Sequence, residues 1–159
     1  MAERERGFTE TMESARLKAP IYHIHKNNDE RQMYENRLAV DNIEGRQFVE
    51  DYFLKEHPTG IVCYDDSTAL VVMRALHQEG IAIPKDVSIV GFNDIPFMDM
   101  LPTSLTTIRA DFYKMGQLAG KLLLDLIHQR VTKEPSPVMT PELVVRESTG
   151  KPAKKRSSR

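Results

Sequence analysis

The chain contains no tryptophan and only one cysteine, Cys63, among its 159 residues. A single cysteine excludes an internal disulfide and any metal site built from cysteines alone. No apolar run approaches the roughly 20 residues that span a bilayer, and the first ten residues contain no apolar signal core. These absences predict a chain that does not enter a membrane and works in the reducing cytoplasm.

The charges are spread unevenly, although the net charge is only -1. Residues 151–159 contain five basic side chains and no acidic one, which leaves 17 basic against 23 acidic residues and a charge of -6 on the rest. An acidic body is a poor general binder of nucleic acid. We expect one folded unit over residues 1–150 and a basic, disordered tail over 151–159.

Four stretches have the apolar spacing of amphipathic helices. In the first, Phe8 and Met12 lie on one face, and Pro20 ends the pattern. The third begins at the acidic pair after residue 64 and ends near Gly80, and the fourth carries a long apolar stripe behind the potential cap Asp111. The expected helices cover 3–18, 43–56, the segment from 66 to Gly80, and 112–129.

Five short runs are typical of strands. Two of them, GIVCY at 60–64 and VSIVGF at 87–92, are continuously apolar, which predicts strands buried on both faces. The others cover 21–25, 105–108 and 142–148, while 26–42 fits a loop or a short helix equally well. Strands that alternate with helices predict an α/β fold with a mostly parallel sheet flanked by helices.

Polar side chains follow the two apolar strands directly. Asp65 and Asp66 come after the first, and Asn93 and Asp94 come after the second. Ligands bind outside the carboxyl ends of the strands in such sheets. The spacing favours Asp66 as the helix N-cap. It favours Asn93 as a ligand contact and leaves Asp94 open between a ligand contact and a hydrogen bond within the loop.

A long ordered series of motifs resembles the C-terminal half of LacI/GalR-type transcriptional regulators. It begins with R-x-x-G-F at Arg4, continues with the strand ending in Asp65 and with IPKDVSIVGFND, and ends with LTTI and LVVREST, over about residues 1–150. The resemblance implies part of a lobe like that of type I periplasmic binding proteins. It further implies an effector-binding and dimerising portion, with a sugar or sugar derivative as the effector and DNA contacted only through a headpiece that this sequence does not include.

The resemblance also implies roles for individual residues. Arg4 lies where the family reaches the effector, with a solvated helix arginine as the alternative. Asp65 stands where the family commonly carries an effector-contacting asparagine; unlike asparagine, it accepts hydrogen bonds but cannot donate them. Phe112 could present an aromatic edge to the ligand, although its place in the helical stripe favours packing in the core.

The apolar loop at 95–102 corresponds to the dimer interface of the family. We therefore expect a homodimer, with the alternative that the loop folds back over its own core. The residues expected to make buried dimer contacts are Phe97, Met98, Met100 and Leu101. The resemblance also implies that the first strand of the lobe is missing, so that the strands at 21–25 and 60–64 would flank a gap.

Other classes of function receive less support. The C-terminal part of a periplasmic-type sugar-binding protein remains the main alternative, because it shares the fold. No enzyme activity, metal or cofactor is expected. The acidic residues lack the lysine of a receiver domain, and His23 and His25 have no third ligand. Cys63 fits an inert core thiol because no basic residue lies near it in the sequence.

Overall fold

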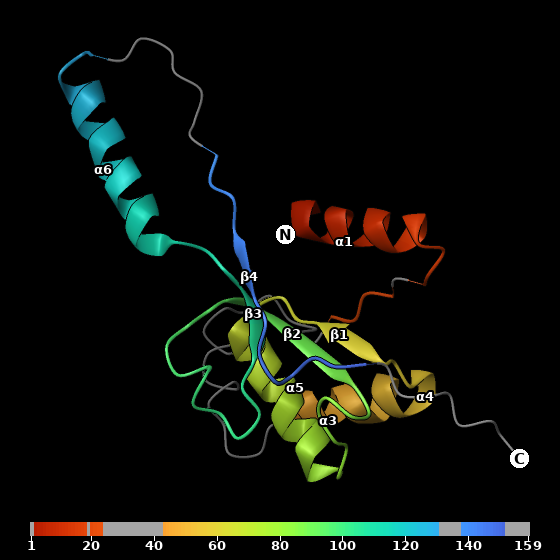
Figure 1. Ribbon diagram of the computed structural model, residues 1–159. Helices are drawn as coiled ribbons and strands as arrows, with labels where there is room; N and C mark the ends of the chain where they lie inside the picture. The colour runs from red at the N-terminus through yellow and green to blue at the C-terminus, as the bar shows by residue number, and fades with distance from the viewer. Residues whose placement is uncertain (1, 19, 24–42, 131–137, 152–159) are drawn as a thin grey trace, which may run out of the picture.

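The computed structural model describes residues 2–18, 20–23, 43–130 and 138–151. A four-stranded sheet in the order β1-β2-β3-β4 lies at its centre (Figure 1). The first two pairings are parallel and the third is antiparallel. This confirms the predicted α/β fold with a mostly parallel sheet. The strands are β1 (Gly60–Val62), β2 (Ser88–Asn93), β3 (Thr106–Arg109) and β4 (Glu142–Val144).

Helices cover the sheet unequally. Figure 1 shows α3, α4 and α5 on one side, α1 on the other, and α6 projecting away. The four predicted helices all form, and the second contains a turn of π-helix, η1. Residues 21–23 form no strand, and the rest of the strand predicted at 21–25 lies outside the described residues. The helical bounds are α1 (Ala2–Ser14), α3 (Ile43–Phe48), η1 (Val49–Phe53), α4 (Leu54–Glu56), α5 (Asp66–Gln78) and α6 (Phe112–Ile127).

The core lies between the sheet and the helices α3, η1 and α5. Val72 and Leu76 come from the inner face of α5, while Ile89 and Leu105 come from the sheet side, and each is at most 2% exposed. Burying an aliphatic side chain of this size contributes about 1.5–3 kcal/mol. The i, i+4 spacing of Val72 and Leu76 explains why α5 presents one continuous apolar face.

The strand at 60–64 is less buried than its composition predicts. Val62 is 57% exposed, because β1 is an edge strand within the described residues and α5 covers only one face of the sheet. Cys63, the next residue, is buried and donates its backbone N–H to the carbonyl of Val90 at 2.8 Å. The prediction that this strand is buried on both faces is therefore wrong.

The last strand ends earlier than predicted, at Val144, and the chain then turns back into the sheet. Ser148 is fully buried at the point where β2 and β3 begin. Its hydroxyl donates to the carbonyl of Ile89 at 2.6 Å and accepts the N–H of Thr106 at 2.8 Å. Its own carbonyl accepts the N–H of Ile89 at 2.8 Å. The motif LVVREST therefore ties the C-terminal segment to two strands.

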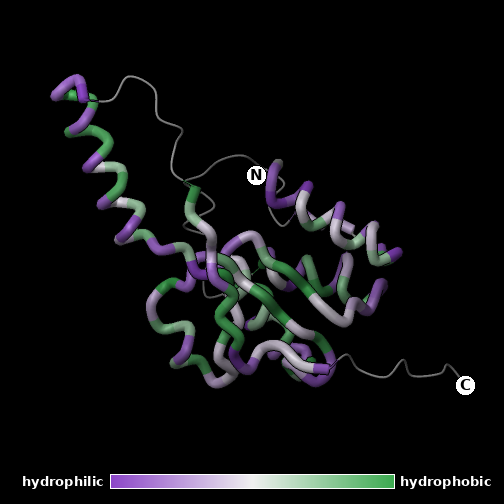
Figure 2. Tube along the Cα trace, turned by 45° about the horizontal axis from the view of Figure 1, so that its top comes forward, coloured by the Kyte–Doolittle hydropathy of each residue, from purple (hydrophilic) through white to green (hydrophobic). Residues whose placement is uncertain are grey.

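Helix α6 keeps its predicted position and cap but not its predicted burial. Asp111 caps it by accepting the N–H of Lys114 at 2.9 Å. No residue of α6 is buried, and Leu123 and Ile127 are 59% and 64% exposed. Figure 2 shows the hydrophobic positions along this projecting helix. Among the described helices, none is long and apolar enough to cross a membrane.

Candidate functional site

Arg4 of α1 reaches the carboxyl ends of β1 and β2. Its guanidinium donates to the backbone carbonyl of Tyr64 at 2.7 Å. The same group lies over the rings of Tyr64 and Phe92, at 4.1 and 4.4 Å from their centroids. A cation over an exposed aromatic ring gains about 0.5–1 kcal/mol, so the two rings and the carbonyl fix an otherwise exposed side chain. The structure thus places Arg4, although exposed, at the carboxyl ends of β1 and β2, and its contact with a ligand stays a prediction.

The cap of α5 is Asp65 and not Asp66, so the predicted cap assignment is wrong, while a ligand contact by Asp65 stays a prediction. Asp65 is the N-cap of α5, and its carboxylate accepts the N–H of Thr68 at 2.7 Å. Asp66 begins the helix and is fully buried. Its carboxylate accepts the hydroxyl of Thr107 at 2.6 Å and the N–H of Ile95 at 2.8 Å. The helix starts one residue earlier than the cap assignment assumed, which turns Asp66 inward over the sheet.

The buried carboxylate of Asp66 needs a glycine beneath it. A Cβ on Gly91 would collide with Asp66 Oδ1 and would approach Leu105 Cδ2 to 2.9 Å. Only a residue without a side chain leaves the space in which Asp66 lies across β2 and β3. The pair therefore fixes the start of α5 against the sheet, directly below the candidate site.

Asn93, the last residue of β2, offers an open polar group. Its side chain is partly exposed, and its carboxamide has no hydrogen-bond partner within the described part of the chain. A carboxamide both donates and accepts, so it can pair with a hydroxyl in either direction. The backbone of Asn93 has a φ of 109°, outside the regions that side-chain-bearing residues favour. This geometry fits the predicted ligand contact, which stays a prediction.

Asp94 is occupied by two arginines that come from other elements. Its Oδ2 lies 2.6 Å from Arg109 Nε, and its Oδ1 lies 2.7 Å from Arg146 Nη2. The Asp94 side chain is only 8% exposed. Burial alone would raise its pKa, but the hydrogen bonds and charges of Arg146 and Arg109 hold the pKa of Asp94 below its ordinary value. The structure thus shows Asp94 paired with arginines of other elements and not with its own loop, and a ligand contact by Asp94 stays a prediction.

The other predicted site residues fall in different surroundings. Phe112 is 56% exposed at the start of α6, so the favoured core packing is wrong. Phe97 and Met100 are 69% and 75% exposed, as a contact surface requires. Met98 is 4% exposed and belongs to the core, and Leu101 packs partly against that core. The loop at 95–102 therefore divides between the two alternatives, and Met98 is not available for a dimer contact.

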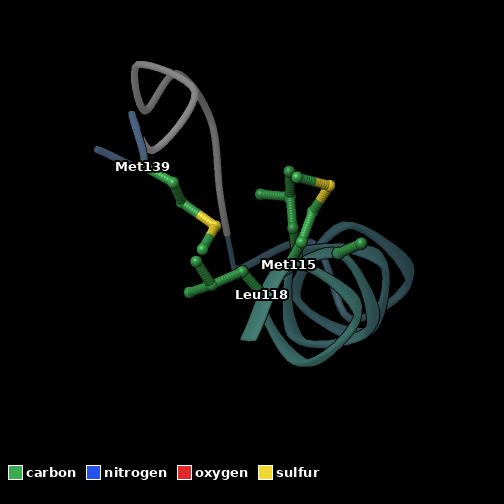
Figure 3. A pocket seen from close by; sticks show the side chains of 5 residues that line it. Met115, Leu118 and Met139 are labelled. Carbon is green, nitrogen blue, oxygen red and sulfur yellow. The ribbon is translucent and has the colours of Figure 1, made fainter. Parts of the chain in front are cut away.

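Two further features carry no polar chemistry. An apolar pocket lies between α6 and the segment that precedes β4, and Met115, Leu118 and Met139 converge on it (Figure 3).

Cys63 is buried, and burial, with the charges of Asp65 and Asp66 beside it, raises the pKa of its thiol to about 12. This confirms that Cys63 lies in the core, while its low reactivity stays a prediction. The described segments contain no group of three or more His, Cys, Asp or Glu side chains that could hold a metal.

Sequence patterns alone missed four residues that shape the site. Tyr64 and Phe92 hold Arg4, and Arg109 and Arg146 hold Asp94. The two aromatic residues immediately precede polar residues that were singled out, so their positions carried a usable signal. The arginines lie 15 and 52 residues from Asp94, and no local pattern connects residues at that separation.

The sequence matches the family described as periplasmic binding protein-like domain over residues 1–149. It is 42% identical over 96 residues to the arabinose metabolism transcriptional repressor of Geobacillus stearothermophilus, covering 60% of this chain and 26% of that protein. It is 38% identical over 120 residues to the HTH-type transcriptional regulator MalR of Streptomyces coelicolor, covering 76% of this chain and 34% of that protein.

The fold is also similar to known structures. A LacI family transcriptional regulator from Enterococcus faecium with bound ribose is matched with a TM-score of 0.63 and 30% identity, over 71% of this chain and 41% of that one. The chain thus spans about a quarter to a third of the length of these curated relatives and about two fifths of this structure. The chain belongs to the periplasmic-binding-protein-like domain family, and its homologues are LacI-family HTH transcriptional regulators.

Proposed function

We propose that this chain is the effector-binding and dimerising portion of a LacI-type transcriptional regulator, and that the effector is a sugar or a sugar derivative. The observation that carries the proposal is the polar edge formed by Arg4, Tyr64 and Asn93 at the carboxyl ends of β1 and β2. Regulators among the relatives favour this function over a periplasmic sugar-binding protein with the same fold.

The chemistry of this edge suits a polyhydroxylated ligand. The guanidinium of Arg4 is a planar fork of donors that can contact two neighbouring hydroxyls. Asn93 supplies both a donor and an acceptor. The rings of Tyr64 and Phe92 add apolar surface beside these polar groups, which is the mixture that small-molecule sites use. Asp65 stays a proposed ligand contact, although its carboxylate also caps α5. Phe112 stays a proposed aromatic contact at the start of α6.

The test is sugar binding to the purified chain, measured by saturation-transfer NMR with a panel that includes ribose and arabinose. We expect weak, saturable binding by at least one sugar, because one lobe buries only part of a ligand. Asn93→Ala should weaken that binding. Lys85→Ala is the matched control, since Lys85 lies in the loop before β2, at the opposite end of the strand. No binding by any sugar, or equal binding by both variants, would contradict the assignment.

The dimer proposal now rests on the exposed part of the loop at 95–102. Phe97 and Met100 present apolar surface that a partner copy would cover. The double variant Phe97→Asp with Met100→Asp should shift a dimer to monomer in sedimentation, because charge without a partner is costly to bury. Tyr113→Asp is the control, as Tyr113 is 77% exposed on α6. A monomeric wild type, or a double variant that dimerises as tightly, would refute this interface.

Further parts of the proposal concern the setting of the protein. Neither relative is named as an enzyme, and we assign no catalytic step to the chain. DNA contact would come through a headpiece that lies outside this sequence, and the regulator would act in the cytoplasm. Gel-shift assays with the chain alone should show no sequence-specific binding to duplex DNA. Sequence-selective binding of duplex DNA that persists at high salt would contradict the proposal that DNA is contacted through the headpiece.

A further inference from the structure

The turn after β2 has an unfavourable backbone. Asn93 and Asp94 are consecutive residues with φ angles of 109° and 53°. A side chain disfavours this half of backbone space, and two adjacent residues there persist only where the surroundings fix them. The candidate ligand group, the Asn93 carboxamide, is attached to this strained turn. Its orientation therefore depends on the contacts that hold the turn.

Two carboxylates hold the turn from opposite sides. Asp66, below it, accepts the N–H of Ile95 at 2.8 Å. Asp94, within the turn, reaches outward to Arg109, whose Nε and Nη2 both lie 2.6 Å from Asp94 Oδ2. Arg146 completes the clamp at 2.7 Å from Oδ1, and a second nitrogen of that guanidinium donates to a backbone carbonyl at 2.8 Å.

The two arginines connect the turn to neighbouring strands. Arg109 is the last residue of β3 and is the register partner of Asn93 across the sheet. Its guanidinium also lies 3.8 Å from the carboxylate of Glu142, the first residue of β4. Arg146 lies in the segment that follows β4. The carboxylate of Asp94 therefore links the turn to the neighbouring strand β3 and to the segment that follows β4.

The same contacts leave Asp94 with little to offer a ligand. Both of its oxygens are engaged, and its side chain is 8% exposed. Asn93 has the opposite character, since its carboxamide is partly exposed and makes no hydrogen bond to another described residue. We infer that Asp94 is a positioning residue: its ion pairs with Arg109 and Arg146 hold the strained turn that aims the Asn93 carboxamide into the ligand edge. This inference rests on the proposed function for its purpose, but its geometry can be tested without a ligand.

The test is NMR spectroscopy of the sugar-free chain in the wild type and in Asp94→Asn. The three-bond coupling between the amide and α protons of Asn93, read together with the one-bond coupling between its α carbon and α proton, reports the sign and size of its φ angle. We expect the wild type to show the positive φ and Asp94→Asn to lose that signature, while the amide signals of Ile89 and Leu105 in the core stay in place. Asp99→Asn is the matched control, because it makes the same charge change on an exposed residue of the same loop.

A second variant covers the case in which Asp94→Asn fails to fold. Arg109→Gln removes one partner of the carboxylate, and the Arg109 side chain is already 46% exposed, so the core is untouched. Loss of the positive φ at Asn93 in a folded Asp94→Asn supports the inference, and its retention in that variant overturns it. If Asp94→Asn does not fold, Arg109→Gln decides by the same criterion.

Sugar binding separates this inference from the proposed function. If a sugar binds through Asn93, Asp94→Asn should weaken that binding by about tenfold, the order expected when one polar contact is misplaced. Binding of a sugar that is insensitive to Asn93→Ala would refute the proposed function and leave the result on the turn intact. A turn that keeps its φ in Asp94→Asn would refute the inference even where sugar binding is confirmed.

Discussion

Replacing Asp66 by alanine removes the buried acceptor on which two other elements depend. The hydroxyl of Thr107 and the N–H of Ile95 donate to it at 2.6 and 2.8 Å, and Asp66 is fully buried. A buried donor left without an acceptor costs about 1–3 kcal/mol, so two such donors cost roughly 2–6 kcal/mol. Relief from burying a charge reduces this total. Against a typical stability of about 5–15 kcal/mol, we expect a large loss.

Urea denaturation followed by circular dichroism measures this loss. Asp86→Ala is the control, because its carboxylate accepts the N–H of Ala82 at 2.9 Å but is exposed, and such surface changes stay within about 0.5 kcal/mol. Thr107→Val combined with Asp66→Ala should cost less than the sum of the two single changes, since both remove the same hydrogen bond. If Asp66→Ala lowers the free energy of unfolding no more than Asp86→Ala does, the structural role assigned to Asp66 is wrong.

Three further predictions follow from the same contacts. Gly91→Ala should lower the melting temperature at a cost of about 1–3 kcal/mol or more, because its Cβ would collide with the carboxylate of Asp66, and an unchanged melting curve would contradict that crowding. Cys63, with its pKa raised to about 12, should react with a thiol reagent only after unfolding, so fast labelling of the native chain would refute its burial. The pKa of Asp94 is lowered in the folded chain. The ionised carboxylate therefore contributes fully to the free energy of unfolding above the pKa of aspartate in the unfolded chain, about 3.9. This contribution is lost as the pH falls through the lower pKa of Asp94 in the folded chain. Asp94→Asn should therefore make the free energy of unfolding less sensitive to acid below about pH 4, and an acid dependence equal to that of the wild type would exclude this role.

Local patterns predicted the elements that are stabilised locally. The apolar spacing predicted helix α5, and Gly80, which has a φ of 70°, indicated where the helix ends. The same reasoning misplaced the cap by one residue, because Asp65 and Asp66 have equal capping chemistry. The buried partners that separate them lie 29 and 41 residues further along the chain.

Burial was the property that composition predicted least well. Val62 and the stripe of α6 both have the apolar sequence of core positions, yet Val62 and Leu123, for instance, are 57% and 59% exposed. Hydrophobic periodicity shows which face of an element avoids water, but it does not name what covers that face. In the loop at 95–102, the adjacent apolar residues Phe97 and Met98 are 69% and 4% exposed, a difference that their similar hydrophobicity does not predict.

The position of the candidate site was predicted from the strand ends, and its ligand contacts stay predictions. Asn93 follows from the position of an amide after an apolar strand, and Arg4 was identified from a family motif. The roles of Arg109 and Arg146 depend on pairings across the sheet that only the folded chain creates.

The most direct test of the account is to map where a sugar binds on the folded chain. Amide chemical-shift changes should be recorded while the sugar that gives the strongest saturation transfer is titrated into the labelled protein. The account predicts changes at Tyr64, Asn93 and their neighbours, together with the side-chain signals of Arg4. Changes confined to the apolar pocket on α6, or to the opposite end of the strands around Lys85, would contradict it.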